Sequence, residues 1–159
     1  MFTALRAYAV IRGNEGDRRV AMREFFTGPY ETVVGPTEVL VELRVPAEPG
    51  AGSAYAKVSR RSGDWAVAAA GAVVRLAGKV VEEVGIGLTA VGAPAFAAPP
   101  AEDHLRGRVP TDDALAAAAA LAAEYCQPVA DQRGPVDYKR HLAGELTLRA
   151  LRTAVDRCV

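Results

Sequence analysis

Every segment with a strand-like pattern lies in the first part of the chain, and both long helical patterns lie near its end. This order matters because alternating strands and helices predict a parallel α/β sheet, whereas strands followed by helices predict an α+β fold. An α+β fold is therefore expected. With 159 residues, of which 50% are hydrophobic, the chain can bury one core or two small ones without disulfides or metals.

A β-hairpin is predicted near the beginning of the chain. Residues 7–12 and 19–23 are short and β-rich, and residues 13–17 between them (GNEGD) tolerate positive φ. Turn signals follow at residues 25–30 (FFTGPY) and 34–36 (VGP).

The next predicted strand, at residues 38–45, ends at a linker. Its side chains alternate, so Leu40, Glu42 and Arg44 would share one face and Val39, Val41, Leu43 and Val45 the other. Prolines and glycines in residues 46–52 (PAEPGAG) then disfavour any regular element. We expect a subdomain boundary here, with residues 1–48 before it and 49–159 after it.

Three further strands are predicted after the linker, at residues 54–59, 65–76 and 80–91. The second is almost wholly apolar, as expected of a strand that is covered on both faces. In the third, apolar and small residues alternate, with Val84, Ile86 and Leu88 on one side and Gly85, Gly87 and Thr89 on the other. Close packing is expected on the nearly bare side.

The helical patterns begin after a connection, residues 93–103, whose prolines and alanines predict irregular structure. Thr111 is a predicted N-cap, because its side chain can accept from backbone donors and two aspartates follow in the first turn. That helix is expected to end at about Tyr125, and a last helix to cover residues 136–157. The apolar stripe of the last helix would contain Tyr138, Leu142, Leu146, Ala150, Leu151 and Val155.

Charge and cysteine content narrow the possible functions. Basic and acidic residues both number 19, so net charge gives no reason to expect nucleic acid or an anionic membrane as partner. Cys126 and Cys158 suggest neither a disulfide framework nor a metal knuckle, and a cytoplasmic location is expected. The chain shows no signal-peptide pattern and no uninterrupted apolar stretch of about 18 residues, so no integral membrane segment is expected.

One nucleotide-binding pattern, GIGLTA at residues 85–90, matches GxGxxG/A. In a dinucleotide site these glycines lie in a turn between a strand and a helix, where helix-starting N–H groups face the pyrophosphate. Here they alternate within a predicted strand, and Pro94 follows. We therefore interpret the pattern as structural.

Two other features have a structural and a functional interpretation. Lys57, Arg60 and Arg61 form a small basic cluster that could hold a phosphate or carboxylate, although most such clusters are simply solvated. Trp65 follows the turn Gly63-Asp64, where an indole can pack against a planar ligand or belong to the core. Residue chemistry alone leaves both questions open.

The two histidines, His104 and His141, are far apart in sequence, and neither has a second ligand at the spacing of a zinc or nucleophile site. No catalytic triad, phosphate loop or metal site can be assembled from the residue types present. We therefore predict neither catalytic nor metal-binding residues in this chain.

Read in order, several segments resemble the FAD-binding (medium) subunit of molybdenum hydroxylases of the carbon monoxide dehydrogenase type. They are residues 25–32 (FFTGPYET), 38–46, 55–66 (YAKVSRRSGDWA), 85–93, 131–134 (DQRG) and 138–141 (YKRH). The similarity covers nearly the whole chain. It implies that residues 1–48 are the incomplete end of a molybdopterin-dehydrogenase-type FAD-binding subdomain. Residues 49–159 would be the carboxyl-terminal domain, a small antiparallel sheet packed with helices.

The resemblance also implies a cofactor, partners and site residues. Proteins of this family carry FAD and pass electrons from a molybdenum-cofactor large subunit, through the [2Fe–2S] clusters of a small subunit, to an external acceptor. By resemblance, Leu40 would lie near the flavin, Lys57 would contact the cofactor, and Trp65 would cover the isoalloxazine ring. A cation suits the polar edge of the ring, and an indole can stack on its face.

One part of the family pattern has no counterpart here. Family members begin with a further stretch that contains two glycine-rich loops, whose backbone amides hold the FAD pyrophosphate. The chain is therefore expected to start inside the first flavin subdomain, as a fragment or split subunit, or as a shortened protein without FAD. A component of a molybdenum-containing oxidoreductase is the leading interpretation, and a non-catalytic assembly module is the alternative.

Overall fold

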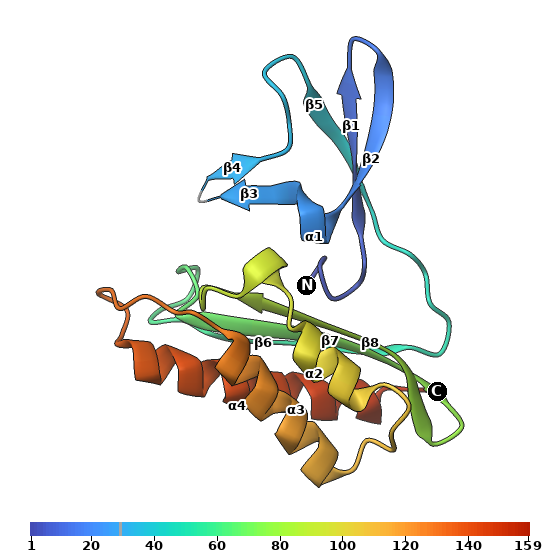
Figure 1. Ribbon diagram of the computed structural model, residues 1–159, viewed down its shortest axis with the longest axis vertical. Helices are drawn as coiled ribbons and strands as arrows, with labels where there is room; N and C mark the ends of the chain where they lie inside the picture. Colours follow the sequence, from blue (N-terminus) through green and yellow to red (C-terminus); the bar gives the residue numbers. More distant parts are fainter. Residues whose placement is uncertain (29) are drawn as a thin grey trace.

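The computed structural model describes residues 1–28 and 30–159, which form two lobes joined by residues 45–51 (Figure 1). The smaller lobe contains β1 (Tyr8–Gly13), β2 (Gly16–Ala21), α1 (Met22–Phe25), β3 (Phe26–Gly28), β4 (Glu31–Thr32) and β5 (Val39–Arg44). The larger lobe contains β6 (Gly52–Val58), β7 (Ala68–Ala77), β8 (Val80–Thr89), the 3₁₀ turn η1 (Pro94–Phe96), α2 (Pro99–Leu105), α3 (Asp112–Tyr125) and α4 (Val136–Asp156). All strand pairs are antiparallel, and the predicted α+β class is confirmed.

The smaller lobe is built on a three-stranded sheet in the order β2-β1-β5. The predicted hairpin is confirmed, with β1 and β2 in register from Tyr8↔Ala21 to Gly13↔Gly16. Its core gathers on one face of β1 and consists of Ala7, Ala9, Ile11, Met22 and Phe25. Of the turn predicted at residues 25–30, Pro29 lies outside the described residues.

Strand β5 differs from its predicted alternation because its pairing with β1 shifts register. Leu43 pairs with Ala9, but Leu40 pairs with Ile11, so a bulge separates the two pairs. Ala9 and Ile11 lie on the same face of β1, and residues directly opposite each other share a face. The predicted separation of Leu40 from Leu43 is therefore wrong, because the bulge brings both to the face of the small core.

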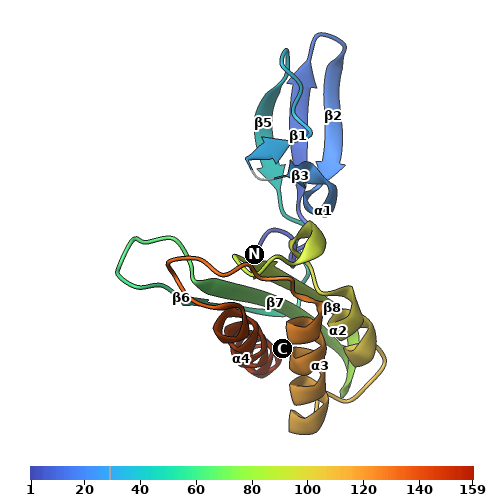
Figure 2. The same cartoon turned by 60° about the vertical axis from the view of Figure 1, so that its left-hand side comes forward.

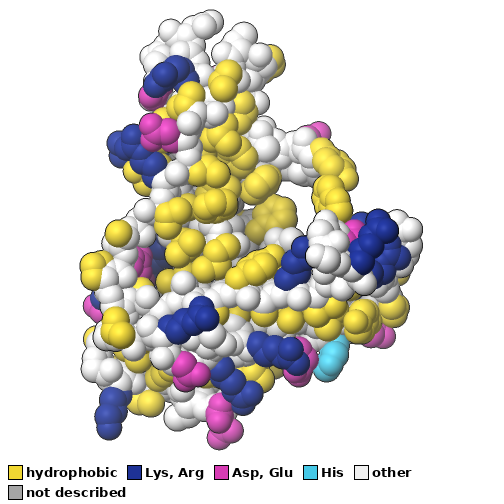
Figure 3. Space-filling model, turned by 180° about the vertical axis from the view of Figure 1, so that it is seen from behind, with side chains coloured by type: hydrophobic (Ala, Val, Ile, Leu, Met, Phe, Trp, Pro, Cys, Tyr) yellow, Lys and Arg dark blue, Asp and Glu magenta, His cyan; other side chains and the backbone are white. Residues whose placement is uncertain are grey.

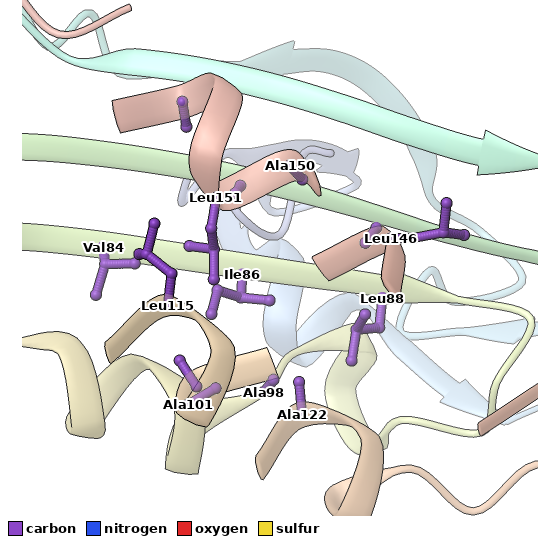
Figure 4. Close-up of a cluster of buried hydrophobic side chains, with 14 of the residues drawn as sticks. Val84, Ile86, Leu88, Ala98, Ala101, Leu115, Ala122, Leu146, Ala150 and Leu151 are labelled. Atoms are coloured by element: carbon purple, nitrogen blue, oxygen red, sulfur yellow. The ribbon is translucent and has the colours of Figure 1, made fainter. Parts of the chain in front are cut away.

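The larger lobe is a sheet in the order β6-β7-β8 with helices on one face (Figure 2). Helix α4 packs along β6 and β7, α2 lies against β8, and α3 packs on both helices. Alternate residues of β8, Val84, Ile86 and Leu88, point toward these helices, where they meet Leu115 and Leu151 (Figure 4). Strand β7 is buried on both faces from Ala68 to Val74, as its apolar sequence predicted.

Two predictions for the later part of the chain need correction. Residues 93–103 are not irregular throughout, because they contain η1 and the start of α2. Pro99 and Pro100 occupy the first turn of α2, where a missing N–H costs nothing. In α4 the buried stripe is shifted, because Tyr138 is exposed while Ala143, Thr147 and Ala154 are buried with Leu146, Ala150 and Leu151.

Other boundaries agree only in part, because the strand predicted at 19–23 is β2 (Gly16–Ala21) with its end in α1, and the strand predicted at 65–76 begins at Ala68. Three predicted features agree more closely. The N-cap is confirmed, since Thr111 Oγ1 accepts from Ala114 N at 3.2 Å, and α3 ends at Tyr125. No regular element is found in residues 45–51, where the linker was predicted. The assignment of residues 1–48 and 49–159 to two named domains stays a prediction.

Candidate functional site

The turn between β6 and β7 carries two of the predicted site residues. It closes through Val67 N, which donates to Val58 O at 2.8 Å, and Gly63 takes a positive φ of 75°. Lys57 Nζ donates to the carbonyl oxygen of Asp64 at 2.7 Å. Lys57 and Trp65 are therefore held next to one another at the end of β6.

Asp64 organises this turn through its side chain. Its Oδ1 accepts from Trp65 N at 2.8 Å, and the side chain is only 9% exposed. Oδ2 lies 3.8 Å from the Nε atoms of both Arg60 and Arg61, and it is buried without a hydrogen-bond donor among the described residues. A buried acceptor of this kind normally has a partner, so Oδ2 can accept from an arginine that moves closer or from a ligand.

Trp65 itself is 70% exposed. Residue chemistry left a core aromatic and a ligand contact equally open, and this exposure excludes the core. Asp64 holds the backbone N–H of Trp65, and the large indole faces solvent, where it is available to cover a planar group.

The face of the sheet turned away from the helices is lined by glycine and closely packed. A Cβ added to Gly85 would lie 2.0 Å from Ala4 O, and one added to Gly87 would lie 3.3 Å from Ala4 N. Gly71 meets Met1 in the same way. The expected packing on the bare side of β8 is therefore confirmed, and it comes from residues 1–4. The GxGxxG pattern lies within β8 under this packing, so these glycines cannot cradle a pyrophosphate.

A hollow of about 190 Å³ lies between the two lobes on this side. Its lining comes from both lobes and consists of Met1, Phe2, Thr3, Met22, Phe26, Thr89 and Phe96. Phe26 and Phe96 meet edge to face across it, with ring centroids 5.0 Å apart. Apolar side chains border the space between the lobes in Figure 3. The sequence did not indicate this hollow, because Phe26 and Phe96 are distant in the chain.

A second hollow, of about 300 Å³, lies on the α2 side of the junction and is lined partly by Arg6, Arg23 and Glu102. Arg23 of the smaller lobe and Glu102 of α2 form an ion pair of 2.5 Å, and the Glu102 side chain is only 4% exposed. The same carboxylate accepts from Ile86 N at 2.7 Å on the open edge of β8. Glu102 therefore joins the lobes, and nothing in its sequence context signalled this role.

Leu40, the third predicted site residue, lies on β5 of the smaller lobe and is 40% exposed. The structure brings Lys57 and Trp65 together but places Leu40 on a different sheet. In residues 1–28 and 30–159 no group of His, Cys, Asp and Glu side chains could hold a metal ion. No helix in the same residues is long and apolar enough to cross a membrane.

The family of the CO dehydrogenase flavoprotein C-terminal domain matches residues 53–154, more than half of the chain. The chain belongs to this family. The carbon monoxide dehydrogenase medium chain of Hydrogenophaga pseudoflava is 41% identical over 98% of this chain and 54% of its own length. The corresponding medium chain of Afipia carboxidovorans is 37% identical over 99% of this chain and 55% of its own length.

Solved structures related to this CO dehydrogenase flavoprotein family share the fold of both lobes. Carbon monoxide dehydrogenase from Hydrogenophaga pseudoflava, in a form that lacks the Mo-pyranopterin moiety, superposes with a TM-score of 0.94 at 42% identity. That match covers 99% of this chain and 55% of the other. Quinoline 2-oxidoreductase from Pseudomonas putida 86 gives a TM-score of 0.86 at 32% identity, over 98% of this chain and 54% of the other. The chain thus spans about half the length of the curated relatives it matches.

Proposed function

We propose that the chain is part of the FAD-binding subunit of a molybdenum hydroxylase. In that subunit it helps to pass electrons from iron–sulfur clusters through FAD to an external acceptor. The observation that carries the proposal is the ordered match of both lobes to a carbon monoxide dehydrogenase chain, with a TM-score of 0.94 over 99% of this chain. Residues 1–48 would end the FAD-binding subdomain, and residues 49–159 would be the carboxyl-terminal domain.

The side chains of the candidate site suit the ring end of FAD. An isoalloxazine ring has apolar faces and an edge of donors and acceptors. Trp65 offers an exposed indole, Lys57 offers a cation beside the same turn, and Asp64 Oδ2 is a buried acceptor that has no donor in the described part of the chain. FAD, when bound, would supply the redox chemistry, and these residues would bind, orient and shield it.

The phosphate end of FAD would be held elsewhere. Residues 1–4 occupy the space above the glycines of β8. The resemblance assigns the pyrophosphate loops to a stretch without a counterpart in this chain. We therefore assign Lys57 to the cofactor edge, Trp65 to the ring face, and Leu40 to the flavin side of the smaller lobe.

Site-directed variants test these roles in the purified complex. Lys57→Ala is expected to lower the ratio of FAD to protein, whereas Lys79→Ala, which changes an exposed lysine in the β7–β8 turn, should leave it unchanged. Trp65→Ala is expected to change the rate of flavin reoxidation, and Trp65→Phe should restore most of the wild-type rate. If Lys57→Ala and Trp65→Ala both behave like the wild type, the assignments fail.

The partners in this proposal are a molybdenum-cofactor large subunit and a [2Fe–2S] small subunit. Purification of this chain under native conditions should recover the large subunit, the small subunit and flavin together with it. Repeated isolation of a chain that has neither flavin nor partner would contradict the proposal.

One observation favours a second function, that of a non-catalytic assembly module. Every residue of β5 is exposed, and four of the six are Val or Leu. Such a surface suits a protein partner whether or not FAD is bound. A colourless chain that still forms a complex would support this alternative, and FAD bound in a 1:1 ratio would exclude it.

A further inference from the structure

Two turns that are distant in sequence lie at the same end of the larger lobe. A Cβ added to Gly52, the first residue of β6, would meet Ala154 O, so the last part of α4 lies beside the start of β6. From Gly52 to Val58 a strand rises about 20 Å, and from Ala154 back to Tyr138 a helix covers about 24 Å. The β6–β7 turn therefore lies at the level of the first turn of α4 and the loop before it. Figure 1 and Figure 2 both show these loops side by side.

Each of these two segments is fixed by a lysine that donates to a backbone carbonyl. In the first, Lys57 binds Asp64 O at 2.7 Å. In the second, the buried Lys139 binds Val129 O at 2.8 Å and Asp131 Oδ2 at 2.9 Å. Both segments are thus held in one conformation before any partner arrives, which lowers the entropy cost of binding.

The exposed side chains of these segments have the composition of a protein-recognition surface. Arg61 has a side chain that is 83% exposed, Val129 is 75% exposed and Tyr138 is 43% exposed. Arginine and the aromatic residues contribute most to binding energy at protein interfaces, and the exposed apolar side chains supply the centre such an interface needs. Trp65 borders the same surface.

This end is also basic, although the whole chain is neutral. Residues 57–66 and 128–141 contain six Lys and Arg but only three Asp, whereas the full sequence has 19 of each sign. All three aspartates face cations of their own segments, Asp64 toward Arg60 and Arg61, Asp131 toward Lys139, and the exposed Asp137 toward Arg140 at 3.8 Å, so the cations remain in excess. Basic side chains gather at the right-hand edge of Figure 3, which is this end of the lobe.

We infer that this end of the lobe docks a carboxylate-rich surface of an acidic electron-carrier protein. Arg60, Arg61 and Arg140 would pair with the carboxylates, and Val129 and Tyr138 would form the apolar centre. The inference rests on the proposed function, because docking beside Trp65 would bring the carrier close to the exposed edge of the flavin. Electrostatic complementarity of this kind speeds association and selects the partner.

The test uses the purified 159-residue chain without flavin, so its outcome does not depend on FAD binding. The ¹⁵N-labelled chain is titrated with an acidic plant-type [2Fe–2S] ferredoxin and, in parallel, with basic cytochrome c. We expect saturable shifts in residues 57–66 and 128–141 with ferredoxin only. Raising the salt to about 0.15 M, where the Debye length is about 8 Å, should weaken binding several-fold.

A charge-reversed pair of variants separates this surface from net charge. Arg60→Glu with Arg61→Glu is expected to weaken ferredoxin binding by about tenfold or more. Lys79→Glu with Arg149→Glu makes the same charge change at exposed positions away from this end and should alter it by less than about twofold. The inference would be overturned if ferredoxin did not bind, or if its shifts fell outside residues 57–66 and 128–141. It would also be overturned if cytochrome c bound equally well, or if both variant pairs lost the same affinity for ferredoxin. Tighter binding to vesicles of anionic lipid than to ferredoxin would overturn it as well.

Discussion

Glu38 shows how one side chain fixes the shape of the smaller lobe. Its carboxylate accepts from Arg18 Nε and Nη2, both at 2.7 Å, and from Gly35 N at 2.7 Å. These bonds hold the loop before β5 against the β1–β2 hairpin. They also lower the pKa of Glu38 from 4.5 to about 2, chiefly because of the Arg18 guanidinium.

This pKa predicts acid sensitivity in the smaller lobe. Because the folded-state pKa lies below the unfolded value, Glu38 stabilises the lobe above about pH 4.5, and that contribution is lost as the pH falls toward 2. Thermal unfolding followed between pH 5 and pH 2 should therefore show a smaller loss of Tm in Glu38→Gln than in the wild type. Parallel curves for the two proteins would contradict this account of Glu38.

Gly85 is a residue whose side chain must be absent. Gly85→Ala would place a Cβ 2.0 Å from Ala4 O, so residues 1–4 must move. Overpacking of this kind costs about 1–3 kcal/mol, which denaturant unfolding can measure. The control is Gly144→Ala in α4, where the nearest atom would lie 3.4 Å away and helix propensity favours alanine by roughly 0.5–1 kcal/mol. Equal effects at the two positions would contradict the packing argument.

Sequence reasoning predicted single residues correctly where neighbouring residues determine the conformation. It failed where strand pairing determines which face a side chain occupies. The turn at Gly63-Asp64 could be predicted from residue types, and Lys57 and Trp65 both donate to Asp64 there, Lys57 to its carbonyl oxygen and the Trp65 backbone N–H to its carboxylate. The orientation of Leu40 could not, because it depends on a bulge in the pairing with β1 that no residue of β5 signals.

At the scale of elements, α2 joins the larger lobe to the smaller through Glu102. This carboxylate satisfies Ile86 N on the edge of β8 and pairs with Arg23. Glu102→Ala should lower the free energy of unfolding by about 1–3 kcal/mol, because Ile86 N, a buried donor, loses its acceptor. Loss of the ion pair with Arg23 adds a smaller cost, because Arg23 is partly exposed.

Asp103 is the matched control for Glu102. It is the next residue of α2, its side chain is 72% exposed, and it pairs with Arg106 at 2.6 Å. Asp103→Ala should cost less than about 1 kcal/mol, as is usual for surface pairs. Denaturant unfolding compares the two variants, and a Glu102→Ala cost no larger than that of Asp103→Ala would show that the lobes are joined in another way.

The elements of the larger lobe were mostly predictable, because periodicity and capping residues define them. Helix α2 was missed because two prolines usually signal irregular chain, whereas here they occupy a first helical turn. The stripe of α4 was misplaced because sequence reasoning followed the large side chains, whereas Ala143 and Ala154 belong to the buried face and the exposed Tyr138 does not.

At the scale of the whole molecule, the outer edge of β5 should make the isolated chain associate. It is the last strand of its sheet, and its apolar residues are 37–63% exposed. Sedimentation should show self-association that rises with concentration, and Val39→Lys with Val41→Lys should shift the equilibrium to monomer. Val109→Lys, at an exposed valine outside the sheet, is the control. A wild-type chain that is monomeric at all concentrations would contradict this prediction.

The central claim is that this chain works as part of a flavin-containing subunit, and the most direct test is its isolation under native conditions. The visible spectrum and the native mass of the preparation are measured together. We predict flavin absorption that bleaches on reduction and a native mass that includes FAD and the partner subunits. A colourless protein with the mass of the chain alone, obtained repeatedly, would contradict the claim.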